Sequence, residues 1–217
     1  MILFASRQCF LAPIPEIANA ALLLNEAVNA HVAGHPSLVE DLLRQANMPV
    51  IRAWTESIWG KKSSYVNVQK ELATLTKTGD VVRVTSRMPD VAMQRLLHVR
   101  DGFHCRFCGI PVIRAQVRKR FVKLYPHLKL WGKTNAEQHA AFQAMWVQYD
   151  HVIPHSKGGA NDLSNIVITC APCNFGKMEY TIKEVGLEDP MRREPKKVEW
   201  DGLERFLSSS LAFSGIP

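Results

Sequence analysis

Residues 150–177, DHVIPHSKGGANDLSNIVITCAPCNFGK, carry the clearest structural pattern in this chain. Short β-rich runs at 149–153 and 166–169 flank a loop that contains Gly158 and Gly159, and a helical pattern extends from Asn174 to about residue 185. Short β-rich runs separated by a glycine-containing loop are typical of paired strands. The order strand, loop, strand, helix therefore predicts a ββα unit.

Two Cys-x-x-Cys pairs, Cys105/Cys108 and Cys170/Cys173, are separated by 61 residues. A two-residue spacer lets both sulfurs of a pair bind one tetrahedral ion, and four thiolates form the closed shell of a structural zinc site. The apolar N-terminal sequence lacks the basic region of a signal peptide, so we expect a cytoplasmic protein with reduced thiols. Zinc is therefore favoured over disulfides or free thiols, whereas the remaining Cys9 is expected to be a buried thiol.

Four polar residues of the same stretch have the chemistry of a phosphodiester-cleaving site. Asp150 and His151 are adjacent in a predicted strand, Asn165 follows 14 residues after His151, and Asn174 follows nine residues later. Carboxylate and amide oxygens are ligands for hard cations, and histidine is the commonest general base. The pattern D-H-V-I-P-H-S-x-G-G … N-I-V-I-T-C-x-x-C-N-x-x-K resembles the HNH endonucleases, also called His-Me finger or ββα-metal nucleases, in the branch with four zinc-binding cysteines.

The resemblance covers about residues 96–186 and implies a role for each of these side chains. His151 would be the general base that takes a proton from the attacking water. Asp150 and Asn174 would hold a catalytic Mg²⁺ or Mn²⁺, since an amide offers only its oxygen to an ion. Asn165 would brace the loop and orient the base. All four are expected to be catalytic residues, beside a structural zinc on the four cysteines.

Positive charge is concentrated in the second part of the chain. The formal net charge is +7, and residues 91–217 carry 18 basic and 12 acidic side chains, against 9 and 8 in residues 1–90. Residues 109–136 contain seven basic side chains and no acidic one. Such a block, interleaved with aromatic residues, suits the binding of a phosphate backbone, although a solvated surface has the same composition. His155 is expected at most to contact substrate. The predicted nucleic-acid contacts are Lys157, Lys177, Arg114, Arg118, Lys119, Arg120 and Lys123.

The fold class expected for the whole chain is α+β and mainly helical. Residues 1–90 are expected to form a helical region that is regulatory or binds a partner. Residues 91–187 would form the nuclease domain, with a basic insertion at 109–149, and residues 188–217 a linker and an amphipathic helix. The individual helices are expected at 15–32, 37–46, 49–58, 65–75, 89–100, 135–148 and 200–211, with a further short strand at 81–84.

The expected function is metal-dependent hydrolysis of DNA, by nicking or by cleavage of both strands. Because an unspecific nuclease would harm its host, we expect a protein partner or the N-terminal region to target or restrain it, and defence against foreign DNA fits that logic. Two alternatives stay open: a non-catalytic zinc module that binds nucleic acid, and an RNA-cleaving toxin with the same site. No apolar run approaches the roughly 20 residues that span a bilayer, so no membrane is expected as a partner.

Overall fold

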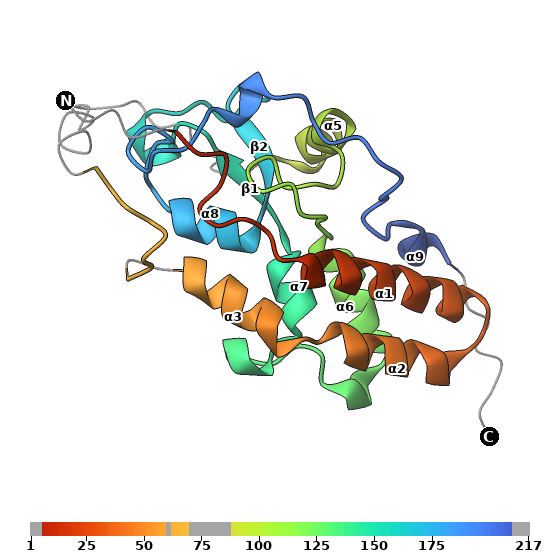
Figure 1. Cartoon of the computed structure of the whole chain (residues 1–217). Coiled ribbons are helices and arrows are strands. Elements are labelled where there is room, and N and C mark those ends of the chain that lie inside the picture. The colour runs from red at the N-terminus through yellow and green to blue at the C-terminus, as the bar shows by residue number, and fades with distance from the viewer. Residues whose placement is uncertain (1–5, 60–61, 70–87, 210–217) are drawn as a thin grey trace.

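The computed structural model describes residues 6–59, 62–69 and 88–209. Its centre is the predicted ββα unit, formed by β1 (Val147–His151), β2 (Ile166–Cys170) and α8 (Ala171–Lys177) (Figure 1). The strands are antiparallel, with Asp150 opposite Val167. Helix α8 follows β2 without a loop, because a proline in its first turn is already in helical geometry.

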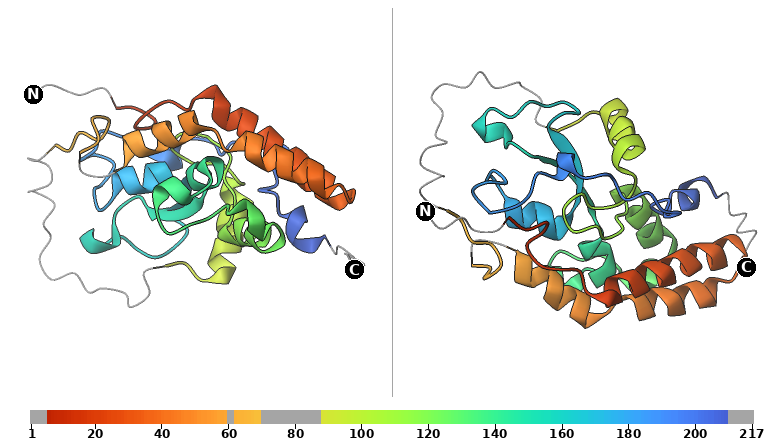
Figure 2. Two further views of the ribbon diagram at one scale, coloured as in Figure 1. Left: turned by 90° about the horizontal axis from the view of Figure 1, so that it is seen from below. Right: turned by 45° about the horizontal axis from the view of Figure 1, so that its top comes forward.

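Three helices at the N-terminus form a layer along one side of the molecule (Figures 1 and 2). They are α1 (Pro15–Val32), α2 (Pro36–Ala46) and α3 (Pro49–Ile58). Each begins with a proline, which is favourable because the N–H groups of a first helical turn have no partner within the helix. Helix α1 packs on α2, and α3 packs on both α7 (Ala140–Ala144) and α8. The N-terminal layer therefore contacts the ββα unit directly.

The remaining elements are three helices, α5, α6 and α9, and four 3₁₀ turns among the described residues. Helix α5 precedes the first cysteine pair and packs on β2, and α6 contacts α9 near the C-terminal end of the described residues. They are α5 (Val91–Asp101), α6 (Ala115–Leu124), α9 (Arg205–Ser208), and the 3₁₀ turns η1 (Pro126–Leu128), η2 (Asn135–Glu137), η3 (His155–Lys157) and η4 (Pro190–Arg192).

The expected α+β, mainly helical class is confirmed, but several expected elements differ. Residues 135–148 were expected as one helix, and the structure divides them into η2, α7 and the start of β1. The helix expected at 174–185 lies mostly outside α8, which ends where Met178 adopts a φ of 51°. Residues 65–69 are not helical; the rest of the helix expected at 65–75 and the strand expected at 81–84 lie outside the described residues.

One hydrophobic core joins the N-terminal layer to α8. It includes Phe10 and Ile58, which are 3% and 0% exposed. A Cβ added at Gly176 of α8 would lie 2.9 Å from Ile58 Cγ2 and 3.1 Å from the Phe10 ring. Glycine at this position therefore lets the helix approach the layer closely, and burial of the two apolar side chains stabilises that approach by about 2 kcal/mol each. Within the described residues, none of the helices has the length and apolarity needed to cross a membrane.

Candidate metal centre and active site

The four paired cysteines meet in one cluster. The sulfur atoms of Cys105, Cys108, Cys170 and Cys173 all lie within 4.8 Å of one another, and the Cys108 and Cys170 sulfurs are 3.6 Å apart. Burial raises the pKa of the Cys105 thiol, but hydrogen bonds from the other three thiols outweigh burial and lower it. Three buried cysteines and the half-buried Cys108 supply four sulfur donors that fit zinc, which four thiolates bind tetrahedrally in a closed structural shell.

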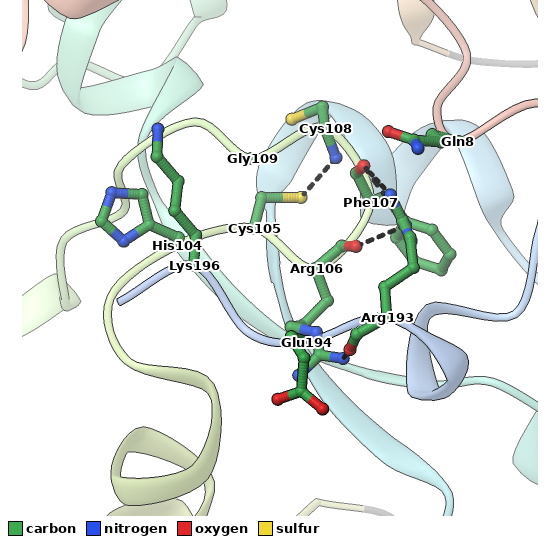
Figure 3. A pocket seen from close by; sticks show the side chains of 10 residues that line it. All are labelled: Gln8, His104, Cys105, Arg106, Phe107, Cys108, Gly109, Arg193, Glu194 and Lys196. Carbon is green, nitrogen blue, oxygen red and sulfur yellow. Dashed lines mark hydrogen bonds between the residues drawn. The ribbon is translucent and has the colours of Figure 1, made fainter. Parts of the chain in front are cut away.

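The turn that carries the first cysteine pair is anchored to helix α5, strand β2 and the C-terminal segment. Asp101, which is fully buried, accepts hydrogen bonds from Arg100, from Arg106 and from the backbone N–H of Ile168. The Arg193 guanidinium donates to the carbonyl of Arg106 over 2.6 Å (Figure 3). These bonds fix Cys105 and Cys108 relative to β2, on which Cys170 lies.

A polar pocket with a volume of about 310 Å³ opens at the end of β1 that lies farther from Cys170 along the strand pair. The His151 and His155 rings face each other edge to face, with their centroids 5.9 Å apart. Ser156 belongs to the quoted sequence pattern but was given no role. Met178 and Glu179 were not singled out because the sequence predicted a helix through them, whereas α8 ends at Lys177. The residues that line it are Asp150, His151, Pro154, His155, Ser156, Met178 and Glu179.

Asp150 is 6% exposed and has two unequal carboxylate oxygens. Its Oδ1 accepts a hydrogen bond from Lys177 Nζ over 3.1 Å, whereas no described residue donates to its buried Oδ2. Burial raises the pKa of Asp150 to about 6, although the Lys177 ammonium opposes this shift. A buried carboxylate oxygen that lacks a protein donor fits a cation ligand.

Lys177 lies in a different environment from the one that its sequence position suggested. Its side chain is fully buried, and Nζ also donates to the carbonyl of His151 over 2.7 Å. A phosphate contact was expected from the sequence, but this ammonium has no exposed surface to offer a phosphate.

The Asn165 side chain is hydrogen-bonded to the backbone of the loop between the two strands. Its Oδ1 accepts from the N–H of Ile153 over 2.8 Å, and its Nδ2 donates to the carbonyls of Ile153 and Ala160 over 3.0 and 2.9 Å. Gly159 is required beside it, because a Cβ there would lie 1.8 Å from the Ile153 carbonyl oxygen. Asn174 is half-buried on α8, one turn before Met178, and its amide makes no hydrogen bond to Asp150 among the described residues.

The segment that contains this pocket matches a known protein family. Residues 140–186 match the HNH endonuclease family. The match contains α7, both strands, the loop, α8 and the second cysteine pair, while Cys105 and Cys108 lie before it. It confirms the resemblance seen in the sequence, and the four clustered cysteines fit a zinc-binding branch of HNH proteins. No curated protein and no solved structure matches the chain.

Two arginines expected to contact nucleic acid instead hold the C-terminal segment against α6. Arg114 Nε donates to Glu204 Oε1 over 2.7 Å, and burial of this pair is partial. Arg120 donates to the backbone carbonyls of Leu207 and Ser209. Because these donors are engaged within the chain, their contribution to a phosphate surface is reduced.

Among the other predicted contacts, exposure differs strongly. Arg118 is 7% exposed, and its guanidinium lies 3.5 Å from the Trp131 ring centroid and 4.7 Å from that of Trp146. Burial lowers the pKa of Arg118 to about 10. Lys119 and Lys123, one helical turn apart on α6, are exposed.

Lys157 lies in η3 of the HNH loop and is partly buried. Its ammonium pairs with the fully buried carboxylate of Glu184. The pairing holds the loop to the segment that follows α8, so this predicted phosphate contact also has a partner within the chain.

Proposed function

We propose that this protein is a metal-dependent endonuclease that hydrolyses DNA phosphodiester bonds at the pocket at the end of β1. The observation that carries the proposal is the juxtaposition, inside an HNH segment, of His151 with a buried carboxylate oxygen of Asp150 that has no donor among the described residues. A base beside a hard-cation ligand is the arrangement that phosphodiester hydrolysis requires.

Asp150, which lines the pocket, would hold the catalytic ion, and Asn174 on α8 is the second ligand that the family pattern implies. Mg²⁺ or Mn²⁺ fits their oxygen donors. Such an ion, when bound, withdraws charge from the phosphate and from the departing oxygen. His151 accepts the proton of the attacking water, and Asn165 keeps the loop that carries His155 and Ser156 in place. Zinc on the cysteine cluster would hold the turn of Cys105 and Cys108 against the end of β2 and the start of α8 in a structural role.

Duplex binding would use the exposed positive charge of the chain. Lys119 and Lys123 on α6 are the best-placed members of the predicted set, since Arg114, Arg120 and Lys177 are engaged elsewhere. Backbone contacts of this kind depend strongly on salt and carry little sequence information. We therefore propose that specificity, and restraint of a nuclease that acts against foreign DNA in the cytoplasm, come from a partner or from the N-terminal helices.

Cleavage of supercoiled plasmid by the zinc-loaded full chain tests this proposal. We expect nicked or linear product with Mg²⁺, no product with EDTA, and no product from His151→Ala that retains zinc. A uniform RNA of matched length in the same buffer distinguishes a DNA nuclease from an RNA-cleaving toxin. Folded, zinc-loaded protein that binds DNA but leaves it intact with every divalent metal would instead support a binding module.

A further inference from the structure

Lys177 is the only lysine among the buried side chains of the described residues. Removing an ammonium from water is costly, so lysine is almost never fully buried unless it is paired. Its ammonium donates to Asp150 Oδ1 at 3.1 Å and to the His151 carbonyl at 2.7 Å, which belong to adjacent residues at the end of β1. The ammonium therefore connects the end of α8 to the two residues that carry the proposed chemistry.

The Asp150–Lys177 pair differs from the other buried acid–base pairs in the part of the chain that the structure describes. Both oxygens of Asp101 accept hydrogen bonds, from arginines and from a backbone N–H. Both oxygens of Glu184 accept hydrogen bonds as well, from Lys157 and from Thr181. Only Asp150 retains a buried oxygen that none of the described residues contacts as a donor.

A purely structural pair would not be expected to leave that oxygen unsatisfied. A buried acceptor without a donor costs about 1 to 3 kcal/mol, and apolar residues often replace a buried ion pair without loss of stability. Because Lys177 occupies Oδ1, the carboxylate is held in one orientation, and Oδ2 of this pocket-lining residue remains for another ligand.

We infer that Lys177 is a positioning residue, which orients Asp150 for the divalent ion through Oδ1 and the His151 carbonyl and does not itself touch the substrate. This inference rests on the proposed function. Removing a group that is hydrogen-bonded to a metal ligand typically weakens metal binding about 10- to 100-fold. We therefore expect Lys177 to act on the affinity for the ion.

The test compares Mn²⁺ binding by zinc-loaded full-length proteins, measured from the electron paramagnetic resonance signal of free Mn²⁺. Asp150→Ala defines the site, and Lys177→Met removes the ammonium while keeping an unbranched apolar chain. We expect Lys177→Met to weaken Mn²⁺ binding about 10- to 100-fold. Plasmid cleavage by this variant should recover as Mn²⁺ is raised, whereas cleavage by His151→Ala should not.

Arg118→Met is the matched control for loss of a buried cation, because its guanidinium packs on the rings of Trp131 and Trp146. We expect this variant to keep its Mn²⁺ affinity within about twofold, so that weaker binding by Lys177→Met cannot be a general effect of removing a buried cation. If Lys177→Met does not fold, Lys177→Gln takes its place; because the amide keeps a neutral donor, we expect the lower end of that loss, about 10-fold.

Mn²⁺ binding by either Lys177 variant at wild-type affinity, when Asp150→Ala has lost it, would overturn the inference. If the wild type binds Mn²⁺ through Asp150 but cuts no DNA or RNA, the nuclease proposal fails and the comparison of affinities still decides the role of Lys177. A wild type that binds no Mn²⁺ at Asp150 would overturn both.

Discussion

Replacement of Asn165 tests how far the loop between the strands is held by one side chain. Asn165 is 6% exposed and makes three hydrogen bonds to the backbone of Ile153 and Ala160, at 2.8, 3.0 and 2.9 Å. Each such bond contributes about 1 kcal/mol net, so Asn165→Ala should lower the free energy of unfolding by about 3 kcal/mol. For a chain of this size that corresponds to a decrease in melting temperature of about 6 to 12 °C.

Asn165→Asp has the same shape but exchanges the donor for an acceptor. An ionised carboxylate would keep the bond from the Ile153 N–H and place an oxygen against the carbonyls of Ile153 and Ala160. We therefore expect its pKa in the folded variant to rise above the ordinary value of about 3.9. A raised folded-state pKa favours the folded state at low pH, and this advantage is lost as pH rises through that pKa. The variant should therefore be closer to wild type at pH 5 than at pH 8.

Denaturant unfolding of the zinc-loaded wild type and both variants at pH 5 and pH 8 measures these differences in stability. Plasmid nicking at pH 8 measures whether the proposed active site still works. The wild type corrects for all other titrating groups. Our account of the loop is refuted if Asn165→Ala stays within 1 kcal/mol of wild type, a third of the expected loss. It is equally refuted if the difference between Asn165→Asp and wild type is the same at both pH values.

Gly159→Ala should abolish nicking and lower the free energy of unfolding by about 1 to 3 kcal/mol, since the new Cβ would lie 1.8 Å from the Ile153 carbonyl oxygen. Gly34→Ala is the control: the position has open space around it, so the left-handed backbone should cost about 1 kcal/mol of stability and leave nicking intact. Cys173→Ser should reduce bound zinc below one equivalent and lower the melting temperature; full zinc content by metal analysis would contradict the four-thiolate site. Burial lowers the pKa of His139 to about 4. Folding therefore gains about 3 kcal/mol from the neutral ring above about pH 6.5, and this contribution is lost as pH falls from 6.5 toward 4. Unfolding free energies measured against pH should fall less steeply for His139→Gln, and identical slopes would exclude His139 as the cause.

The ββα unit and the cysteine cluster could be predicted from the sequence because both depend on short-range patterns. Strand-forming residues, Gly158-Gly159 and the turn-forming cysteine pairs fix local conformation over a few residues. A structural zinc ion needs four ligands, so two cysteine pairs are expected to meet at one ion however far apart they lie in sequence. The 61-residue separation therefore did not prevent the prediction. Asp150 and His151 followed from the family pattern that surrounds them.

The helix expected at 135–148 failed for a reason that local periodicity does not contain. The apolar residues from Ala140 to Met145 and Val147 are buried, but against two different neighbours. Helix α7 packs on α3, and from Val147 onward the chain pairs with β2. Tertiary pairing therefore overrides a continuous helical pattern, as it commonly does.

The partners of the basic residues were equally invisible in the sequence. A block of like charges between residues 109 and 136 indicates a phosphate surface only if its side chains face solvent. Arg114 instead meets Glu204, which lies 90 positions later, and Arg118 is enclosed by Trp131 and Trp146. Such pairings depend on where the C-terminal segment returns in the fold, so composition alone overestimates the exposed charge.

The N-terminal helices contain no motif, but the structure shows a physical reason for the site to depend on them. Lys177 can hold Asp150 only if α8 keeps its position, and the residue before it, Gly176, lies against Ile58 and Phe10. The ββα unit has a sheet of two strands, which is marginal in water unless other elements cover it. By packing on the outer side of α8, the layer that carries Ile58 supplies this cover. A catalytic pattern can therefore be recognised in a short segment, while the geometry that the pattern needs is maintained by residues far from it in sequence.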